Sequence, residues 1–90
     1  MDYRHIMRVI VADALPSCGE VGTEIAKAAL GHPEKVDIEM SNGYAGITAP
    51  STLFDPYDAG LTLWTLHLEY DGVSSAWRQT GISLREVDRP

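Results

Sequence analysis

The sequence predicts an α+β fold in which two N-terminal helices pack on one face of an antiparallel sheet of roughly four strands, made of two hairpins. Two observations carry this prediction. Apolar residues recur at helical spacing in the first third of the chain, and two turn signals, Asn42-Gly43 and Asp71-Gly72, lie in the second half. Both dipeptides favour a type I′ turn, whose twist matches that of paired strands. Each turn therefore fixes a register, which decides which side chains share a face.

Residues 2–15 fit two alternatives. An apolar stripe at helical spacing that ends before Pro16 favours a helix; its members are Tyr3, Ile6, Met7, Ile10 and Ala14. The Met7–Val11 segment is also rich in β-branched residues, which suit a strand. We favour the helix. The strand would give a β-α-β start with the same core residues.

A second helix is predicted over Ser17–Leu30. Ser17 and Glu20 have the spacing of a capping box, in which each side chain accepts a hydrogen bond from a free amide at the helix start. Apolar residues then recur at helical spacing; they are Val21, Ile25, Ala28 and Ala29. Gly31 followed by Pro33 predicts the end of this helix.

The Asn42-Gly43 turn predicts a hairpin with one apolar face. A two-residue turn places Met40 opposite Ala45, Ile38 opposite Ile47, and Val36 opposite Ala49. The other face then carries Asp37, Glu39, Tyr44 and Thr48. Turn chemistry and apolar pattern agree on this register.

The Asp71-Gly72 turn predicts a second hairpin. It pairs four residues of one strand with four of the next: Tyr70 with Val73, Leu68 with Ser75, Leu66 with Trp77, and Trp64 with Gln79. The reverse face carries Thr65, His67, Glu69 and Arg78. Because Ile82 and Leu84 fall out of step with Trp77, we expect a bulge at Gly81 or a second turn over Gln79–Ile82. The predicted core is Ile6, Ile10, Val21, Ile25, Val36, Ile38, Met40, Ile47, Trp64, Leu66, Leu68 and Trp77.

Composition limits the classes of partner. Ninety residues predict a single domain, 1–90. The net charge is −6, and the 7 basic residues are too dispersed to form a phosphate-neutralising stripe. We therefore expect neither nucleic acid nor a membrane as a partner, whereas a basic protein fits.

The one cysteine cannot form an internal disulfide, so we expect a cytoplasmic protein. The three histidines lack the spacing of metal ligands, so we expect neither metal nor cofactor.

Cys18 is the one candidate for catalysis. In the first turn of the predicted helix, its thiolate would feel the positive end of the helix dipole, which lowers the pKa of a thiol. Gly19 and Gly22 would let an anion approach the free amides. The alternative is that Cys18 is a small apolar residue near the helix start, since no base lies near it in sequence.

The connection Pro50–Gly60 is long for so small a domain and carries aromatic side chains. Long loops are often functional, and aromatic side chains are frequent interface anchors. The alternative is that Leu53 and Phe54 fold back over an open end of the core. The residues predicted to bind a partner, in this loop and on the polar sheet face, are Tyr44, Leu53, Phe54, Asp55, Tyr57 and Asp58.

Three hypotheses for function follow. The leading one is a small acidic protein-binding module without enzymatic activity, of the kind found among inhibitors, immunity factors, assembly proteins or phage accessory proteins. The second is a small enzyme or an anion or ligand binder that uses Cys18. The third is a homo-oligomer, with a homodimer formed through a bare sheet face or an unpaired edge strand.

Overall fold

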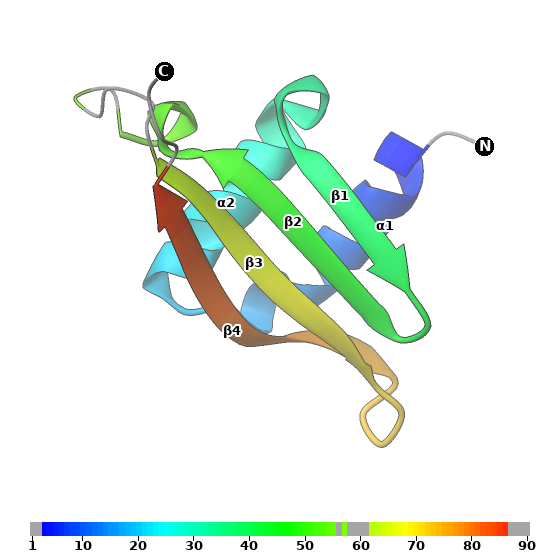
Figure 1. Ribbon diagram of the computed structural model, residues 1–90. Coiled ribbons are helices and arrows are strands. Elements are labelled where there is room, and N and C mark those ends of the chain that lie inside the picture. The colour runs from blue at the N-terminus through cyan, green and yellow to red at the C-terminus, as the bar shows by residue number, and fades with distance from the viewer. Residues whose placement is uncertain (1–2, 56, 58–61, 87–90) are drawn as a thin grey trace.

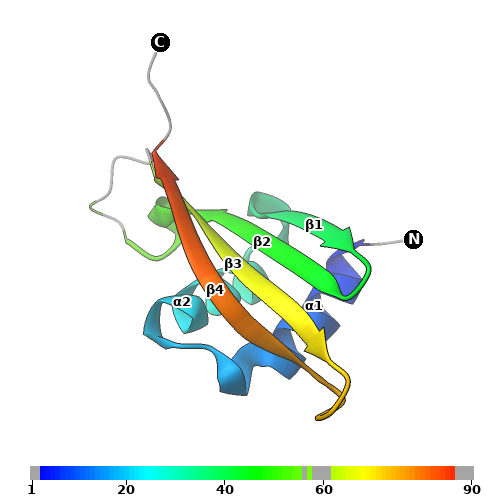
Figure 2. The same ribbon diagram turned by 60° about the horizontal axis from the view of Figure 1, so that its bottom comes forward.

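The computed structural model describes residues 3–55, 57 and 62–86. Two helices lie on one face of a four-stranded antiparallel sheet of order β1-β2-β3-β4 (Figures 1 and 2), which confirms the predicted α+β fold. The elements are α1 (Tyr3–Ala14), α2 (Glu20–Gly31), β1 (Asp37–Ser41), β2 (Tyr44–Pro50), β3 (Thr62–Asp71) and β4 (Ala76–Glu86). Short 3-10 turns span Leu15–Ser17, Pro33–Lys35 and Ser51–Leu53.

The first segment is the helix α1, so the favoured alternative is confirmed. Its buried face consists of Met7, Ile10, Val11 and Ala14. Tyr3, which the predicted stripe included, lies exposed in the first turn.

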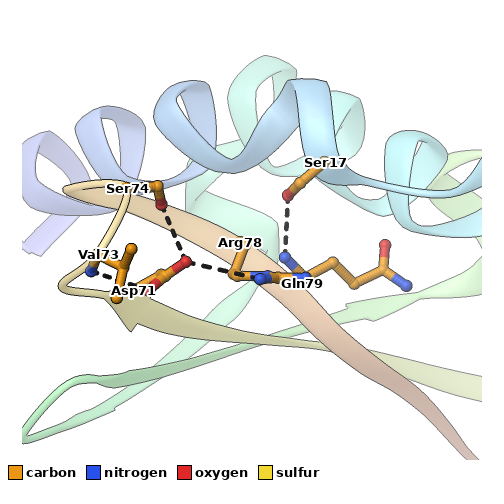
Figure 3. A network of polar contacts seen from close by, with 6 residues as sticks. All are labelled: Ser17, Asp71, Val73, Ser74, Arg78 and Gln79. Atoms are coloured by element: carbon orange, nitrogen blue, oxygen red, sulfur yellow. Dashed lines mark hydrogen bonds and ion pairs between the residues drawn. The ribbon is translucent and has the colours of Figure 1, made fainter.

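The helix α2 begins at Glu20, and the capping box predicted at Ser17 is wrong. The Leu15–Ser17 turn continues from α1, and the Ser17 hydroxyl donates to the Ala14 carbonyl at 2.6 Å. The Ser17 Oγ in turn accepts a hydrogen bond from the backbone N–H of Gln79, in β4, at 3.0 Å (Figure 3). Gly19 is the N-cap instead, and its N–H donates to Gln79 Oε1 at 2.9 Å. A contact with a distant strand has replaced the local cap.

The first hairpin has the predicted register. Met40 lies opposite Ala45, and Ile38 lies opposite Ile47. Only the Gly of the Asn42-Gly43 turn has a positive φ, at 73°, so the turn is not type I′; negative then positive φ is the pattern of a type II turn. Val36 precedes β1, so the predicted pair with Ala49 does not form.

The second hairpin has a longer loop than predicted. Tyr70 lies opposite Trp77 and Leu68 opposite Gln79, so every pair predicted from Asp71-Gly72 is wrong. The turn covers residues 72–75, and Ser75 has a φ of 54°. The pairing has shifted by an even number of residues, however. Because side chains alternate along a strand, each side chain that lies in β3 or β4 keeps its predicted face, whereas Val73 and Ser75 lie in the turn.

The predicted break in strand parity is present as a bulge. His67 lies opposite Gly81 and Leu68 opposite Gln79, which leaves Thr80 as the extra residue, one position before the predicted Gly81. The alternative turn over Gln79–Ile82 does not form. The bulge places Ile82 and Leu84 on the helix side of the sheet, opposite Leu66 and Trp64 respectively.

The core matches most of the prediction. Of the predicted residues, five are buried, namely Ile10, Ile25, Ile47, Leu66 and Leu68, and five pack partly buried against them, namely Ile6, Val36, Ile38, Trp64 and Trp77. Val21 and Met40 are 40% and 37% exposed, so their assignment to the core was wrong. The prediction lacked Met7, Val11 and the buried alanines Ala14, Ala26, Ala28, Ala29, Ala45 and Ala49. These small side chains let the helices lie close to the sheet.

Gly22 in α2 allows this close approach. A Cβ at Gly22 would overlap Gln79 Oε1 and lie 3.3 Å from the Leu66 side chain. Gly22→Ala is therefore expected to displace the Gln79 side chain from the Gly19 amide. We expect Gly22→Ala to lower the free energy of unfolding by about 1 kcal/mol more in the wild type than in a Gln79→Ala background. A double-mutant cycle with urea unfolding measures this difference.

Gly31, the last residue of α2, is the matched control. A Cβ there meets no atom within 4 Å, so Gly31→Ala should change the free energy of unfolding equally in both backgrounds. Equal effects of Gly22→Ala in the two backgrounds would contradict the proposed contact.

Candidate functional site

The loop that the sequence singled out is partly used by the core. Leu53 and Phe54 pack against the buried cluster, and the Phe54 ring meets Trp64 edge to face with centroids 6.4 Å apart. Tyr57 is 97% exposed, and its N–H donates to Asp55 Oδ1 at 3.1 Å. Asp58 lies outside the described residues. Of the binding residues predicted in this loop, Asp55 and Tyr57 are exposed.

Tyr44 lies on the face of the sheet that carries no helix. Its hydroxyl is 2.7 Å from His67 Nδ1, and His67 Nε2 is 2.7 Å from Ser83 Oγ. A Cβ at Gly46 would lie 2.6 Å from the Tyr44 hydroxyl, so the glycine lets the tyrosine side chain cross β2 towards His67. One row further along, the Thr48 and Thr65 hydroxyls are 2.8 Å apart.

The same open face is acidic around Tyr44. Partial burial raises the pKa of the Tyr44 hydroxyl, and the carboxylates of Glu39 and Glu69 raise it further. The phenol is therefore neutral at physiological pH. The His67 imidazole thus bonds to the Tyr44 hydroxyl through one ring nitrogen and to the Ser83 hydroxyl through the other.

Cys18 is not in the first turn of a helix. It precedes the N-cap Gly19, is partly buried, and its Sγ–H donates to the Ala14 carbonyl at 3.4 Å. Burial raises the pKa of the thiol, opposite to the predicted effect of a helix dipole. The physical basis of the Cys18 hypothesis is therefore missing from the structure.

A site that the sequence did not reveal lies at the end of the second hairpin. We call residues 70–77 the β3–β4 arm, because Figure 1 shows this hairpin extending past the other two strands. Asp71 orders its loop (Figure 3): one carboxylate oxygen accepts the Val73 N–H at 3.0 Å, and the other accepts the Ser74 hydroxyl at 3.0 Å. The second oxygen also lies 3.6 Å from the Arg78 guanidinium. The loop is therefore held by one side chain.

The arm carries two exposed side chains, Tyr70 and Val73, beside Trp77, which packs partly against the core. Val73 is 97% exposed at the turn, and Tyr70 is about half exposed. The Tyr70 and Trp77 rings pack edge to face with centroids 5.8 Å apart. We call Tyr70, Val73 and Trp77 the arm patch. Aromatic side chains on a rigid support are frequent anchors of protein interfaces.

The arm patch is attached to the helical layer at its base. Asp13 Oδ2, near the end of α1, accepts the Trp77 N–H at 2.7 Å. Val9, which is exposed, lies one turn before Asp13 on the same side of α1. The arm is thus fixed relative to the helices as well as within its own loop.

Two further findings concern the described part of the chain only. None of its helices is long and apolar enough to cross a membrane. In residues 3–55, 57 and 62–86, no three His, Cys, Asp or Glu side chains gather in a group that could hold a metal ion.

The Asp71 network predicts a pH-dependent order of the arm. Hydrogen bonds from the Val73 amide and the Ser74 hydroxyl, with Arg78 nearby, lower the pKa of the Asp71 carboxyl. The stabilisation of the loop by the Asp71 carboxylate is therefore fully present at pH values above the pKa of an unfolded aspartate, about 3.9. It is lost as the pH falls through the lower pKa of Asp71 in the folded protein. At neutral pH, Asp71→Ala should speed hydrogen exchange of the Val73 amide, measured by NMR. The exchange rates of the wild type and Asp71→Ala should become equal in acid. A difference in rate that persists below the pKa of Asp71 in the folded protein would contradict this role.

The raised pKa of Cys18 predicts a slow thiol. Iodoacetamide should modify it more slowly than a free cysteine peptide at pH 8, and half-maximal reactivity should lie above the pKa of that peptide, because burial disfavours the thiolate. Urea-unfolded protein is the matched control and should react like the peptide. Native reactivity equal to or above that of the peptide would revive the Cys18 hypothesis.

Comparisons with protein-family models, with curated proteins and with solved structures found no match to this chain.

Proposed function

We propose that this protein is a small acidic binding module that docks on another protein through the β3–β4 arm. The observation that supports this most is Val73, which is 97% exposed on a loop ordered by Asp71. A side chain held in place before binding loses little conformational entropy when a partner covers it. Isolated exposed apolar residues are common on protein surfaces, but here Val73 belongs to the same hairpin end as the exposed Tyr70, whose ring packs on Trp77.

Charge indicates the kind of partner. The net charge of −6 and the carboxylates of Asp37, Glu39 and Glu69 on the open sheet face favour a partner with a basic surface. We propose an inhibitor, immunity, assembly or phage accessory role in the cytoplasm, with a protein rather than a nucleic acid or membrane as partner. Tyr57 and Asp55 would extend the contact if the partner reaches the loop between β2 and β3.

The test is affinity capture from the native host with quantitative mass spectrometry. Val73→Asp should reduce recovery of the captured partner about tenfold or more, because burial of a valine contributes about 1.5 kcal/mol or more and a charge removes it. Val73 makes no core contact, so the urea-unfolding midpoint should stay unchanged.

Tyr57→Ser is the matched control, since Tyr57 is equally exposed but belongs to the other loop. Loss of the partner with Tyr57→Ser and not with Val73→Asp would move the binding site to the loop that the sequence indicated. Retention of the partner by both variants would reject binding through either segment.

A further inference from the structure

The free side of the edge strand β4 has two sections that differ in how their amides are satisfied. The Tyr70 N–H donates to the Gly43 carbonyl at 2.9 Å, so in β3 this amide points away from β4. Amides alternate along a strand, so those of Leu68, Leu66 and Trp64 point the same way. The residues opposite them on β4 therefore direct their own N–H groups away from β3, to the free side of the sheet.

The first section of this free side is covered. The Trp77 N–H donates to Asp13, and the Gln79 N–H donates to Ser17. Side chains from the helical layer thus satisfy two successive outward amides. Covering of this kind protects an edge strand from pairing with another chain.

The second section, residues 82–86, has no such cover among the residues that the structure describes. Ile82 lies opposite Leu66, Leu84 opposite Trp64 and Glu86 opposite Thr62, so their N–H groups also point to the free side. Leu84 is 55% exposed, although its side chain lies on the helix side of the sheet. This section combines outward backbone donors with an exposed apolar side chain.

We propose that a second copy of this chain pairs antiparallel with residues 82–86, about a two-fold axis beside Leu84. In this register Leu84 lies opposite Leu84 of the other copy, and Ile82 lies opposite Glu86. Each of the three residues with an outward N–H group then lies opposite a residue of the other copy whose N–H group also points outward. The opposed residues can therefore exchange backbone hydrogen bonds across the axis. The two sheets would join into one.

The side chains also fit a second copy. On the open face, Ser83 of one copy lies opposite Arg85 of the other, and no charged side chain lies directly opposite a like charge. Ser83 and Arg85 line a hollow of about 240 Å³ beside this edge, together with Thr48, Thr65, Leu63 and Leu84. The arginine of the other copy would lie at the rim of this hydroxyl-bearing hollow.

Five residues of one strand bury less than a standard interface, so the dimer should be weak and has to be measured at high concentration. It is independent of the proposed partner site, because the arm lies at the other end of β4. Failure of this proposal would leave binding through the arm untouched.

The test is a disulfide across the two-fold axis, in a Cys18→Ser background. Paired residues in this register have Cα atoms roughly 5.5 Å apart, within the range that a disulfide bridges. Under oxidised glutathione, Leu84→Cys should form a covalent dimer at least about tenfold faster than Ser83→Cys or Arg85→Cys, which lie opposite each other and not themselves. Equal rates for the three variants would overturn the register.

Sedimentation equilibrium of the unmodified chain up to about 500 µM provides the second measurement. Leu84→Glu should weaken the dimer about tenfold or more, because it brings two carboxylates together at the axis, while Leu84→Val should retain it. Leu84→Pro removes one outward N–H without removing a β3–β4 hydrogen bond, and should abolish the dimer. A wild-type chain that is monomeric throughout this range would overturn the proposal, with the edge left to solvent or to a foreign strand.

Discussion

The contact between Ser17 and the backbone of Gln79 is the constraint on which the rest of the structure depends. It joins the end of the first helical segment to the edge strand, and the Gln79 side chain returns to the Gly19 amide at the start of α2. Together these bonds fix both helices relative to β4, as Figure 3 shows for Ser17 and Gln79. They explain why Ser17 does not cap α2 and why Gly22 carries no side chain at the closest approach. The Ser17 hydroxyl also covers the outward N–H of Gln79 on the edge strand.

The open sheet face and the β3–β4 arm differ in what they offer a partner. On the open face, the hydrogen-bonding groups of Tyr44, His67 and Ser83 are bonded to one another. A partner that used these groups would first break bonds each worth about 1 kcal/mol net. On the arm, polar contacts serve to order the loop, while the exposed Val73 and Tyr70 gain from being covered. This difference is why we propose docking through the arm, with the acidic face contributing long-range attraction.

Local signals predicted the parts of this fold that local interactions determine. The register at Asn42-Gly43 depends on a short turn and an apolar pattern, both visible in sequence. The second register failed because Asp71 bonds to Val73 and Ser74, which lengthens the loop, and because Trp77 pairs with Tyr70. Even so, the residues that stayed in the two strands kept their predicted faces, since a shift by an even number of residues leaves the alternation unchanged.

The candidate site was harder to predict, because exposure is decided by distant elements. Phe54 and Tyr57 look alike in sequence, but only Phe54 finds a neighbour in Trp64. Tyr70 and Val73 were assigned to a paired strand, so their exposure at the end of the hairpin was invisible. The predicted position of Cys18 in the first helical turn was wrong for the same reason as the Ser17 cap: α2 begins later, because the preceding residues contact α1 and β4.

The strand β4 thus has three distinct sections along its length, and their order has a consequence for the proposed assembly. The arm lies at the start of β4, the contacts with the helices follow, and the uncovered edge comes last. In an antiparallel dimer through that edge, the two arms lie at opposite ends of the joined sheet. A partner with a single docking site therefore gains no avidity from the dimer, because it cannot reach both arms. A partner that presents repeated sites gains avidity only if their spacing matches the length of the joined β4 strands, so dimerisation would select for extended or oligomeric targets.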